Sequence, residues 1–130
     1  MPTGFDDRYD YRVDLLRRRN RVTARIGDTV LAETERCILV DEQDHGIVFY
    51  VPKADVRMDL LQPSDHRTVC PFKGEASHFD AEGVTTVAWT YEDPHPQVEA
   101  LRDHIAFYQD RVQVQVGVAT PAVSWYKPKS

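Results

Sequence analysis

Chemically reactive side chains are concentrated between residues 65 and 74, in the segment DHRTVCPFKG. Cys70 lies four residues after His66 and three residues before Lys73. A nearby cation lowers the pKa of a thiol and raises the fraction of reactive thiolate. The segment therefore allows a thiol-dependent reaction with Cys70, His66 and Lys73 as catalytic candidates. Because free cysteine is among the most buried residue types, simple packing of Cys70 is the interpretation that we favour.

The same segment contains residue types that bind zinc. The candidate ligands are Asp65, His66, Cys70 and His78. The four-residue spacing of His66 and Cys70 suits a helix, whereas Pro71 and the β-branched pair Thr68–Val69 favour extended chain. We therefore predict hydrogen-bonded loop residues and no metal site.

A ligand pocket is the leading hypothesis from the sequence. Aromatic residues could form its walls, and charged residues from the 57–74 segment could form its rim. A cation could then lie on the aromatic faces, or Arg57 and Lys73 could hold an anion. In the structural alternative, the aromatic residues belong to the core and Arg57 pairs with Asp65 as an internal brace. The predicted ligand-binding residues are Arg57, Asp59, Asp65, His66, Cys70, Lys73, Trp89 and Tyr91, with Phe72 and Tyr108 as further wall candidates.

Alternating apolar residues predict the strands that would position these groups. Val22, Ala24 and Ile26 alternate with polar residues before Gly27–Asp28, which indicates a β-hairpin with a type II′ turn. Residues 47–51 are apolar throughout, as in a central strand that is buried on both faces. Further strands are expected on both sides of Lys73–Gly74 and in residues 87–91 and 112–116.

Helical periodicity is limited to two places. Asp93 and Pro94 can start a helix near 94–106, and a short helical turn is expected near 54–60. The fold class is thus mainly β: a bent antiparallel sheet or incomplete barrel with one helix. We divide the chain into an N-terminal extension (1–20), a β domain (21–117) and a C-terminal tail (118–130). The tail carries Trp125 and Tyr126, the one hint of an interaction module.

Composition limits the partners and the location. The formal net charge of −5 opposes binding to nucleic acid, and no apolar run approaches the length of a membrane span. No secretory signal is visible, so we expect a small soluble cytoplasmic domain with Cys37 and Cys70 as free thiols. The sequence identifies no cofactor, substrate or oligomeric state.

Four ordered blocks carry a family resemblance: residues 56–61 (VRMDLL), 63–66 (PSDH), 70–74 (CPFKG) and 88–94 (AWTYEDP). They resemble the signature blocks of a bacterial family of unknown function that is labelled as a nucleotidyltransferase. The resemblance covers about residues 21–117 and implies a β-tent-like barrel, similar to that of B-type methionine sulfoxide reductases. Val69 and His78 depart from the family pattern.

Nucleotidyl transfer requires a pair of carboxylates that bind Mg²⁺ and a glycine-rich segment that binds the phosphates. Asp55 and Asp59 are the nearest approach to such a pair, and GxxxxGK[ST] is absent. An enzyme of this kind, or one that uses Cys70, is the alternative to a ligand-binding domain.

Overall fold

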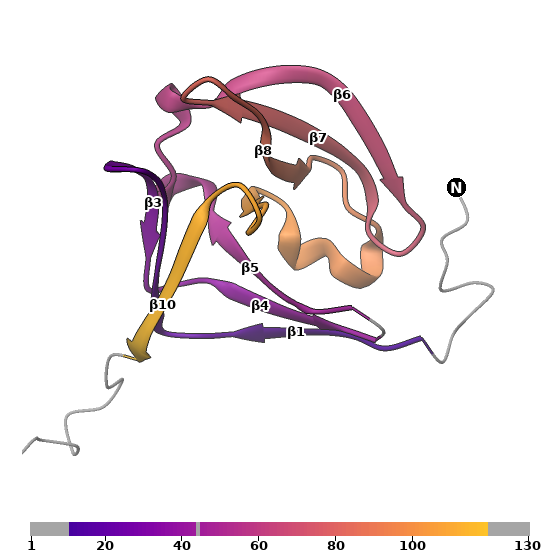
Figure 1. The fold of residues 1–130 in the computed structure, drawn as a ribbon. Helices are drawn as coiled ribbons and strands as arrows, with labels where there is room; N and C mark the ends of the chain where they lie inside the picture. The colour runs from indigo at the N-terminus through magenta and orange to yellow at the C-terminus, as the bar shows by residue number, and fades with distance from the viewer. Residues whose placement is uncertain (1–10, 44, 120–130) are drawn as a thin grey trace, which may run out of the picture.

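The computed structural model describes residues 11–43 and 45–119 of the 130-residue chain. Strands dominate this part, joined by short 3₁₀ segments (Figure 1). The strands are β1 (Val13–Arg17), β2 (Asn20–Ile26), β3 (Thr29–Thr34), β4 (Ile38–Glu42), β5 (Ile47–Pro52), β6 (Gln62–Cys70), β7 (Gly74–Ala81), β8 (Val84–Tyr91), β9 (His104–Phe107) and β10 (Gln113–Ala119). The 3₁₀ segments are η1 (Lys53–Asp55), η2 (Met58–Leu60) and η3 (Pro96–Leu101).

The strands form two antiparallel sheets. The larger has seven strands in the order β1-β4-β5-β9-β8-β7-β6, and the smaller has the order β10-β2-β3. Figure 1 shows that the larger sheet is strongly bent, so that β6, β7 and β8 arch over β1, β4 and β5 with η3 between them. Its edge strands, β1 and β6, do not pair with each other, and the sheet stays open. The predicted fold class, mainly β with a bent antiparallel sheet, is confirmed.

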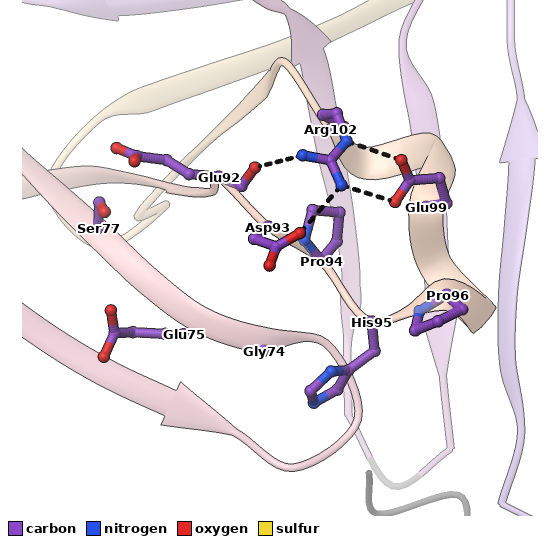
Figure 2. A pocket seen from close by; sticks show the side chains of 10 residues that line it. All are labelled: Gly74, Glu75, Ser77, Glu92, Asp93, Pro94, His95, Pro96, Glu99 and Arg102. Carbon is purple, nitrogen blue, oxygen red and sulfur yellow. Dashed lines mark hydrogen bonds and ion pairs between the residues drawn. The ribbon is translucent and has the colours of Figure 1, made fainter. Parts of the chain in front are cut away.

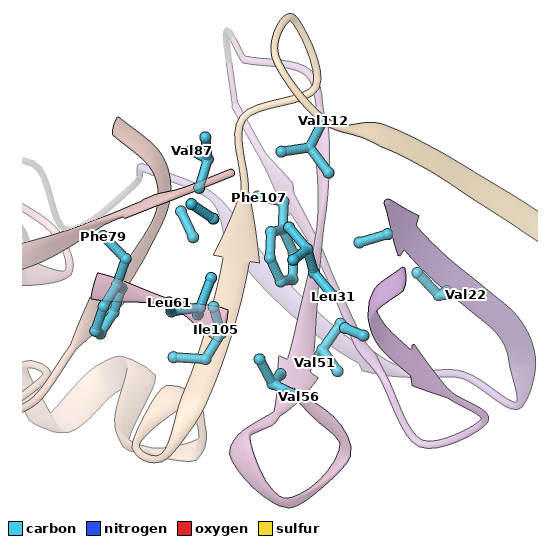
Figure 3. Packing of buried hydrophobic residues seen from close by; sticks show 14 of the residues in the cluster. Val22, Leu31, Val51, Val56, Leu61, Phe79, Val87, Ile105, Phe107 and Val112 are labelled. Carbon is cyan, nitrogen blue, oxygen red and sulfur yellow. The ribbon is translucent and has the colours of Figure 1, made fainter. Parts of the chain in front are cut away.

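Each face of the bent sheet has its own hydrophobic core, because successive strand residues point to opposite faces. On the convex side, residues such as Leu31, Val51 and Phe107 pack between the two sheets (Figure 3). On the concave side, Tyr50, Tyr91 and Ala106 pack with Leu101 of η3. Neighbouring residues of β5 and β9 therefore belong to different cores.

The predicted helix near 94–106 is much shorter in the structure. Only η3, at Pro96–Leu101, is helical, and it is a 3₁₀ segment that is kinked at Val98 (φ −127°). Asp103 has a left-handed backbone (φ 61°), which ends any helical path before β9. Ile105 and Phe107 instead alternate along β9, a strand inside the larger sheet.

The helical turn predicted near 54–60 consists of two separate 3₁₀ turns, η1 and η2. Between them, Val56 is extended (φ −110°, ψ 137°) and forms an isolated bridge with Ala32. Asp55 and Asp59 therefore do not share a helix face. Asp55 accepts a hydrogen bond from Thr34 at 2.6 Å, and Asp59 pairs with Arg57.

The hairpin at residues 22–32 is confirmed as β2 and β3, and Gly27 has the positive φ (58°) that the first position of a type II′ turn requires. β5 is less buried than expected, since Ile47 is 50% exposed. β10 lies at a sheet edge. No helix in the described ranges is long and apolar enough to cross a membrane.

Part of the predicted N-terminal extension belongs to the sheet. Val13–Arg17 forms β1, which pairs with β4, and Tyr11 is buried just before it. Tyr11, Val13 and Leu15 alternate with polar residues, a strand pattern that the surrounding charges obscured. The predicted tail residues Trp125 and Tyr126 lie outside the described part of the chain.

Candidate functional site

A cavity of about 400 Å³ opens in the concave face of the bent sheet. It lies between the β4–β5 hairpin, the turn that joins β6 to β7, and the end of β8. Most of its lining is apolar or aromatic, and a few polar groups converge on it. The lining residues are Val40, Glu42, His45, Gly46, Val48, Tyr50, Val69, Cys70, Pro71, Phe72, Lys73, Trp89 and Tyr91.

Three aromatic rings form one wall of this cavity. The Tyr50 and Trp89 rings meet edge to face, with centroids 6.1 Å apart, and the Trp89 Nε1–H donates to the Tyr50 hydroxyl at 3.2 Å. The Tyr91 ring lies 6.4 Å from Tyr50. Burial raises the pKa of both phenols well above their ordinary value, so both stay protonated at neutral pH. The wall is apolar, its rings are inclined to one another, and the Trp89–Tyr50 hydrogen bond fixes two of them in place.

A buried ion pair between Lys73 and Glu42 completes the lining. The Lys73 Nζ contacts Glu42 Oε1, and the side chains are 7% and 9% exposed. The Tyr11 hydroxyl donates to Glu42 Oε2 at 2.6 Å, and His45 lies 3.5 Å from the same oxygen. Burial alone would raise the pKa of the Glu42 carboxyl, but the hydrogen bonds from Lys73 and Tyr11 outweigh it and hold that pKa below its ordinary value.

The β6–β7 turn places Lys73 and Phe72 at the cavity. Its carboxyl end is tied down by the His95 N–H, which donates to the Lys73 carbonyl at 3.0 Å. Gly74 adopts φ 120°, and a Cβ there would lie 3.2 Å from the Asp93 carbonyl oxygen. Phe72 stacks on Tyr11 with ring centroids 3.8 Å apart. The glycine thus permits the close approach that fixes this turn.

Cys70 is half-buried and lines the cavity, whereas Cys37 is fully buried. Burial raises the pKa of the Cys37 thiol. Along a strand, the four-residue separation of His66 and Cys70 corresponds to roughly 13 Å. The structure therefore does not bring the predicted pair of Cys70 and His66 together, although it does bring Cys70 and Lys73 to one cavity.

The remaining predicted site residues lie elsewhere. Arg57 pairs with Asp59 through two hydrogen bonds of 3.1 and 3.0 Å on the surface. The predicted internal brace between Arg57 and Asp65 is wrong, because the Arg57 guanidinium is paired with Asp59, two residues along the chain. Asp65 and His66 are exposed on the edge strand β6. Of the eight predicted residues, Cys70, Lys73, Trp89 and Tyr91 line the cavity.

His66 instead contacts a buried histidine behind the aromatic wall. The His66 and His78 rings lie 4.6 Å apart, and the His66 carbonyl lies 3.3 Å from His78 Nδ1. His78 Nε2 lies 3.1 Å from the Tyr108 hydroxyl, and the Tyr108 ring lies 4.5 Å from that of Trp89. The predicted wall residue Tyr108 thus packs on Trp89 but is not among the residues that line the cavity.

A second, more open recess lies where η3 faces β7 (Figure 2). Acidic side chains surround it, and Arg102 is their counter-charge. Its guanidinium binds Glu99 at 2.7 Å, Asp93 at 3.1 Å and the Glu92 carbonyl at 2.8 Å. These bonds close the loop between β8 and β9, so we assign this recess a structural role.

Of the candidate zinc ligands, His66 and His78 lie in contact, but Cys70 does not join them. Within the described ranges, no three His, Cys, Asp or Glu side chains lie close enough together to hold a metal ion. Cys70 faces the cavity, whereas His78 lies behind the aromatic wall.

Comparison with known proteins identifies the family. Residues 14–117 match the model of a family named NTP_transf_9, which is described as a domain of unknown function (DUF427). The chain belongs to this family. No curated protein matches it. The predicted family resemblance is thereby confirmed, and the DUF427 match begins inside β1, in agreement with the place of that strand in the sheet.

Sequence reasoning missed several lining residues of this DUF427 domain. Glu42 ends a strand and His45 follows it, and both are far in sequence from Cys70 and Lys73. Tyr50 falls within the apolar run 47–51, whose pattern indicates a buried strand and no site residue. The available signal was strand parity, because Glu42 falls on the same face of the strand as Ile38 and Val40.

Proposed function

We propose that this DUF427 domain binds a small polar or aromatic molecule in the cavity on the concave face of its bent sheet. The observation that carries the proposal is the combination of a rigid wall of aromatic rings with a buried Lys73–Glu42 pair in one cavity. Ligand sites are commonly apolar clefts with a few convergent polar groups. A volume of about 400 Å³ suits a molecule of one or two rings.

The thiol-dependent alternative draws less support from the geometry. Cys70 lines the cavity, but His66 is roughly 13 Å away along β6 and contacts His78 instead. The Lys73 ammonium is directed at Glu42. Faster alkylation of Cys70 than of Cys37 would follow from access alone, because Cys37 is 0% exposed. Loss of a measured activity in Cys70→Ser would be needed to revive the thiol alternative.

Nucleotidyl transfer rests on the family label. The carboxylates that could have formed a pair, Asp55 and Asp59, bind Arg36 and Arg57 in two separate 3₁₀ turns. A Mg²⁺-dependent rise in melting temperature with nucleoside triphosphates would favour this alternative, since a ligand that binds only the native state stabilises it.

Titration with planar aromatic fragments, followed in ¹H–¹⁵N NMR spectra, tests the binding proposal. We expect saturable shifts that centre on the amides of Val48, Tyr50, Cys70 and Trp89. Shifts centred on the recess at Arg102 or spread over the surface would contradict the proposal.

A matched pair of variants locates the binding site independently. Val69 lines the cavity and is 73% exposed, and Val116 is an exposed valine (44%) on the smaller sheet. We expect Val69→Trp to weaken fragment binding because the larger side chain crowds the cavity entrance. Val116→Trp should leave binding unchanged. Equal effects of the two substitutions would argue against this cavity.

A further inference from the structure

The charges in the cavity lining restrict the class of ligand. Among the described lining residues, Glu42 and Lys73 carry opposite formal charges and pair with each other. His45 lies at the rim, where its side chain is 64% exposed. The second cation that an anionic ligand would need was expected to be Arg57, but Arg57 is paired with Asp59 outside the cavity. An anion would therefore meet the Glu42 carboxylate with no unpaired cation to offset it.

A cationic ligand meets the opposite difficulty. The Tyr50 and Trp89 rings could attract a cation through their faces. The Lys73 ammonium, however, lines the same cavity and is only 7% exposed. Like charges repel strongly where water is largely excluded. Glu42 thus disfavours an anionic ligand, and Lys73 disfavours a cationic one.

The pair also offers complementary hydrogen-bonding groups to a neutral molecule. An ammonium has three donors, of which one is directed at Glu42, and a carboxylate has about four acceptor positions. Tyr11 occupies one acceptor position on Oε2. A donor and an acceptor are therefore presented side by side in a cavity that aromatic rings also line.

On these grounds, and resting on the proposed function, we infer that the cavity selects neutral planar rings that carry a hydrogen-bond acceptor beside a donor, such as a ring carboxamide or lactam. The acceptor atom of the ligand accepts a hydrogen bond from Lys73, and the N–H of the ligand donates one to Glu42. The ring of the ligand lies on Trp89 or Tyr91. The corresponding carboxylates and amidines are rejected.

Three nearly isosteric compounds test this inference: benzamide (neutral), benzoate (anionic) and benzamidine (cationic). Dissociation constants are measured by NMR titration of the full chain at pH 8, above the ordinary histidine pKa of about 6.5. We expect benzamide to bind about tenfold or more tightly than either charged compound, with shifts at the cavity. Nicotinamide, nicotinate and 1-methylnicotinamide form a second set, for which the same order is expected.

Charge variants of the ion pair supply a second test. Glu42→Gln leaves Lys73 unpaired and should shift the preference toward benzoate. Lys73→Met leaves Glu42 unpaired and should shift it toward benzamidine. The double variant Glu42→Gln/Lys73→Met restores a neutral lining and should again reject both ions. It also keeps the test valid if a single variant fails to fold, because it leaves no unpaired buried charge.

The outcomes separate the two proposals. If benzoate or benzamidine shifts the cavity resonances and binds as tightly as benzamide, the neutral-ligand inference is overturned, whereas the binding proposal stands. The absence of cavity shifts with all six compounds up to about 10 mM, a concentration at which even fragment-like affinities are visible, would count against both.

Discussion

At the residue scale, the arrangement of charge matters more than the presence of reactive types. Two short sequence segments carry Cys70, Lys73, Trp89 and Tyr91, and these four predicted site residues line one cavity. The sequence could not supply Glu42, since a carboxylate 31 residues away reaches Lys73 only through the bend of the sheet. That missing partner changes Lys73 from a free anion-binding group into half of a neutral pair.

His78 shows how burial controls a residue that looked like a metal ligand. It is 1% exposed, and burial lowers the pKa of its imidazole, with the charges of His66 and Arg67 acting in the same direction. The hydrogen bond with the His66 carbonyl opposes this shift but does not cancel it. His78 is therefore neutral in the folded domain at pH 7, and Tyr108 and Thr68 are its other polar neighbours.

This burial predicts a pH dependence of stability. Since the pKa of His78 is lower in the folded than in the unfolded state, the unfolded chain takes up the proton first as the pH falls. The free energy of unfolding should be fully retained above the ordinary pKa of 6.5 and should decline as the pH falls from there to the folded-state pKa. The slope cannot exceed about 1.4 kcal/mol per pH unit. Urea denaturation between pH 5 and 8 measures it.

His78→Gln is the control for this titration. The substitution should lower stability at pH 8 but flatten its pH dependence between 5 and 6.5. Carboxyl groups with lowered pKa values, such as Glu42 and Asp55, contribute only at more acidic pH. An unchanged slope in His78→Gln would assign the pH dependence to another group.

At the element scale, the strands were predictable and the helix was not. Alternation located most of the strands because one face of each is buried. The prediction of a helix at 94–106 failed because the apolar spacing of this segment also fits a 3₁₀ turn followed by a strand. The left-handed residue that separates the two is Asp103, and without a glycine at that position the sequence does not reveal the break. The turn between β6 and β7 follows from the strands expected on both sides of Lys73–Gly74, but its contact with residues 93–95 is long-range and could not be inferred from sequence spacing.

Gly74→Ala tests the role of that contact. The substitution places a Cβ 3.2 Å from the Asp93 carbonyl at a backbone φ of 120°, which only glycine adopts readily. We expect a loss of about 1–3 kcal/mol in the free energy of unfolding. Because Lys73 precedes Gly74, fragment binding in the cavity should weaken as well. Urea denaturation and NMR titration measure the two effects.

Gly46→Ala is the matched control for this substitution. Gly46 also lines the cavity, but a Cβ there has no atom within 4 Å. Its effect on stability should stay within about 0.5 kcal/mol. If the two variants lose similar stability, the close approach at Gly74 is not what fixes the turn.

At the scale of the whole molecule, the bent sheet is shared between two cores. Its convex face packs on the smaller sheet, and its concave face packs on η3 and opens into the cavity. β5 and β9 contribute to both cores, through Val51 and Ile105 on one side and Tyr50 and Ala106 on the other. A change in either core should therefore be transmitted to the other, and the domain should unfold as one unit.

Leu31→Ala tests this cooperativity. Leu31 is 0% exposed between the two sheets, so its truncation should cost about 2–5 kcal/mol, whereas Leu16→Ala on β1, where the leucine is 36% exposed, should cost much less. In a Trp125→Phe background, Trp89 is the one remaining tryptophan and reports on the concave face. We expect its fluorescence and the far-ultraviolet circular dichroism to give coincident urea midpoints, both lowered equally by Leu31→Ala. If the urea midpoint from Trp89 fluorescence stays unchanged while the midpoint from circular dichroism falls, the two sheets unfold separately. The cavity would then not depend on the core between the two sheets.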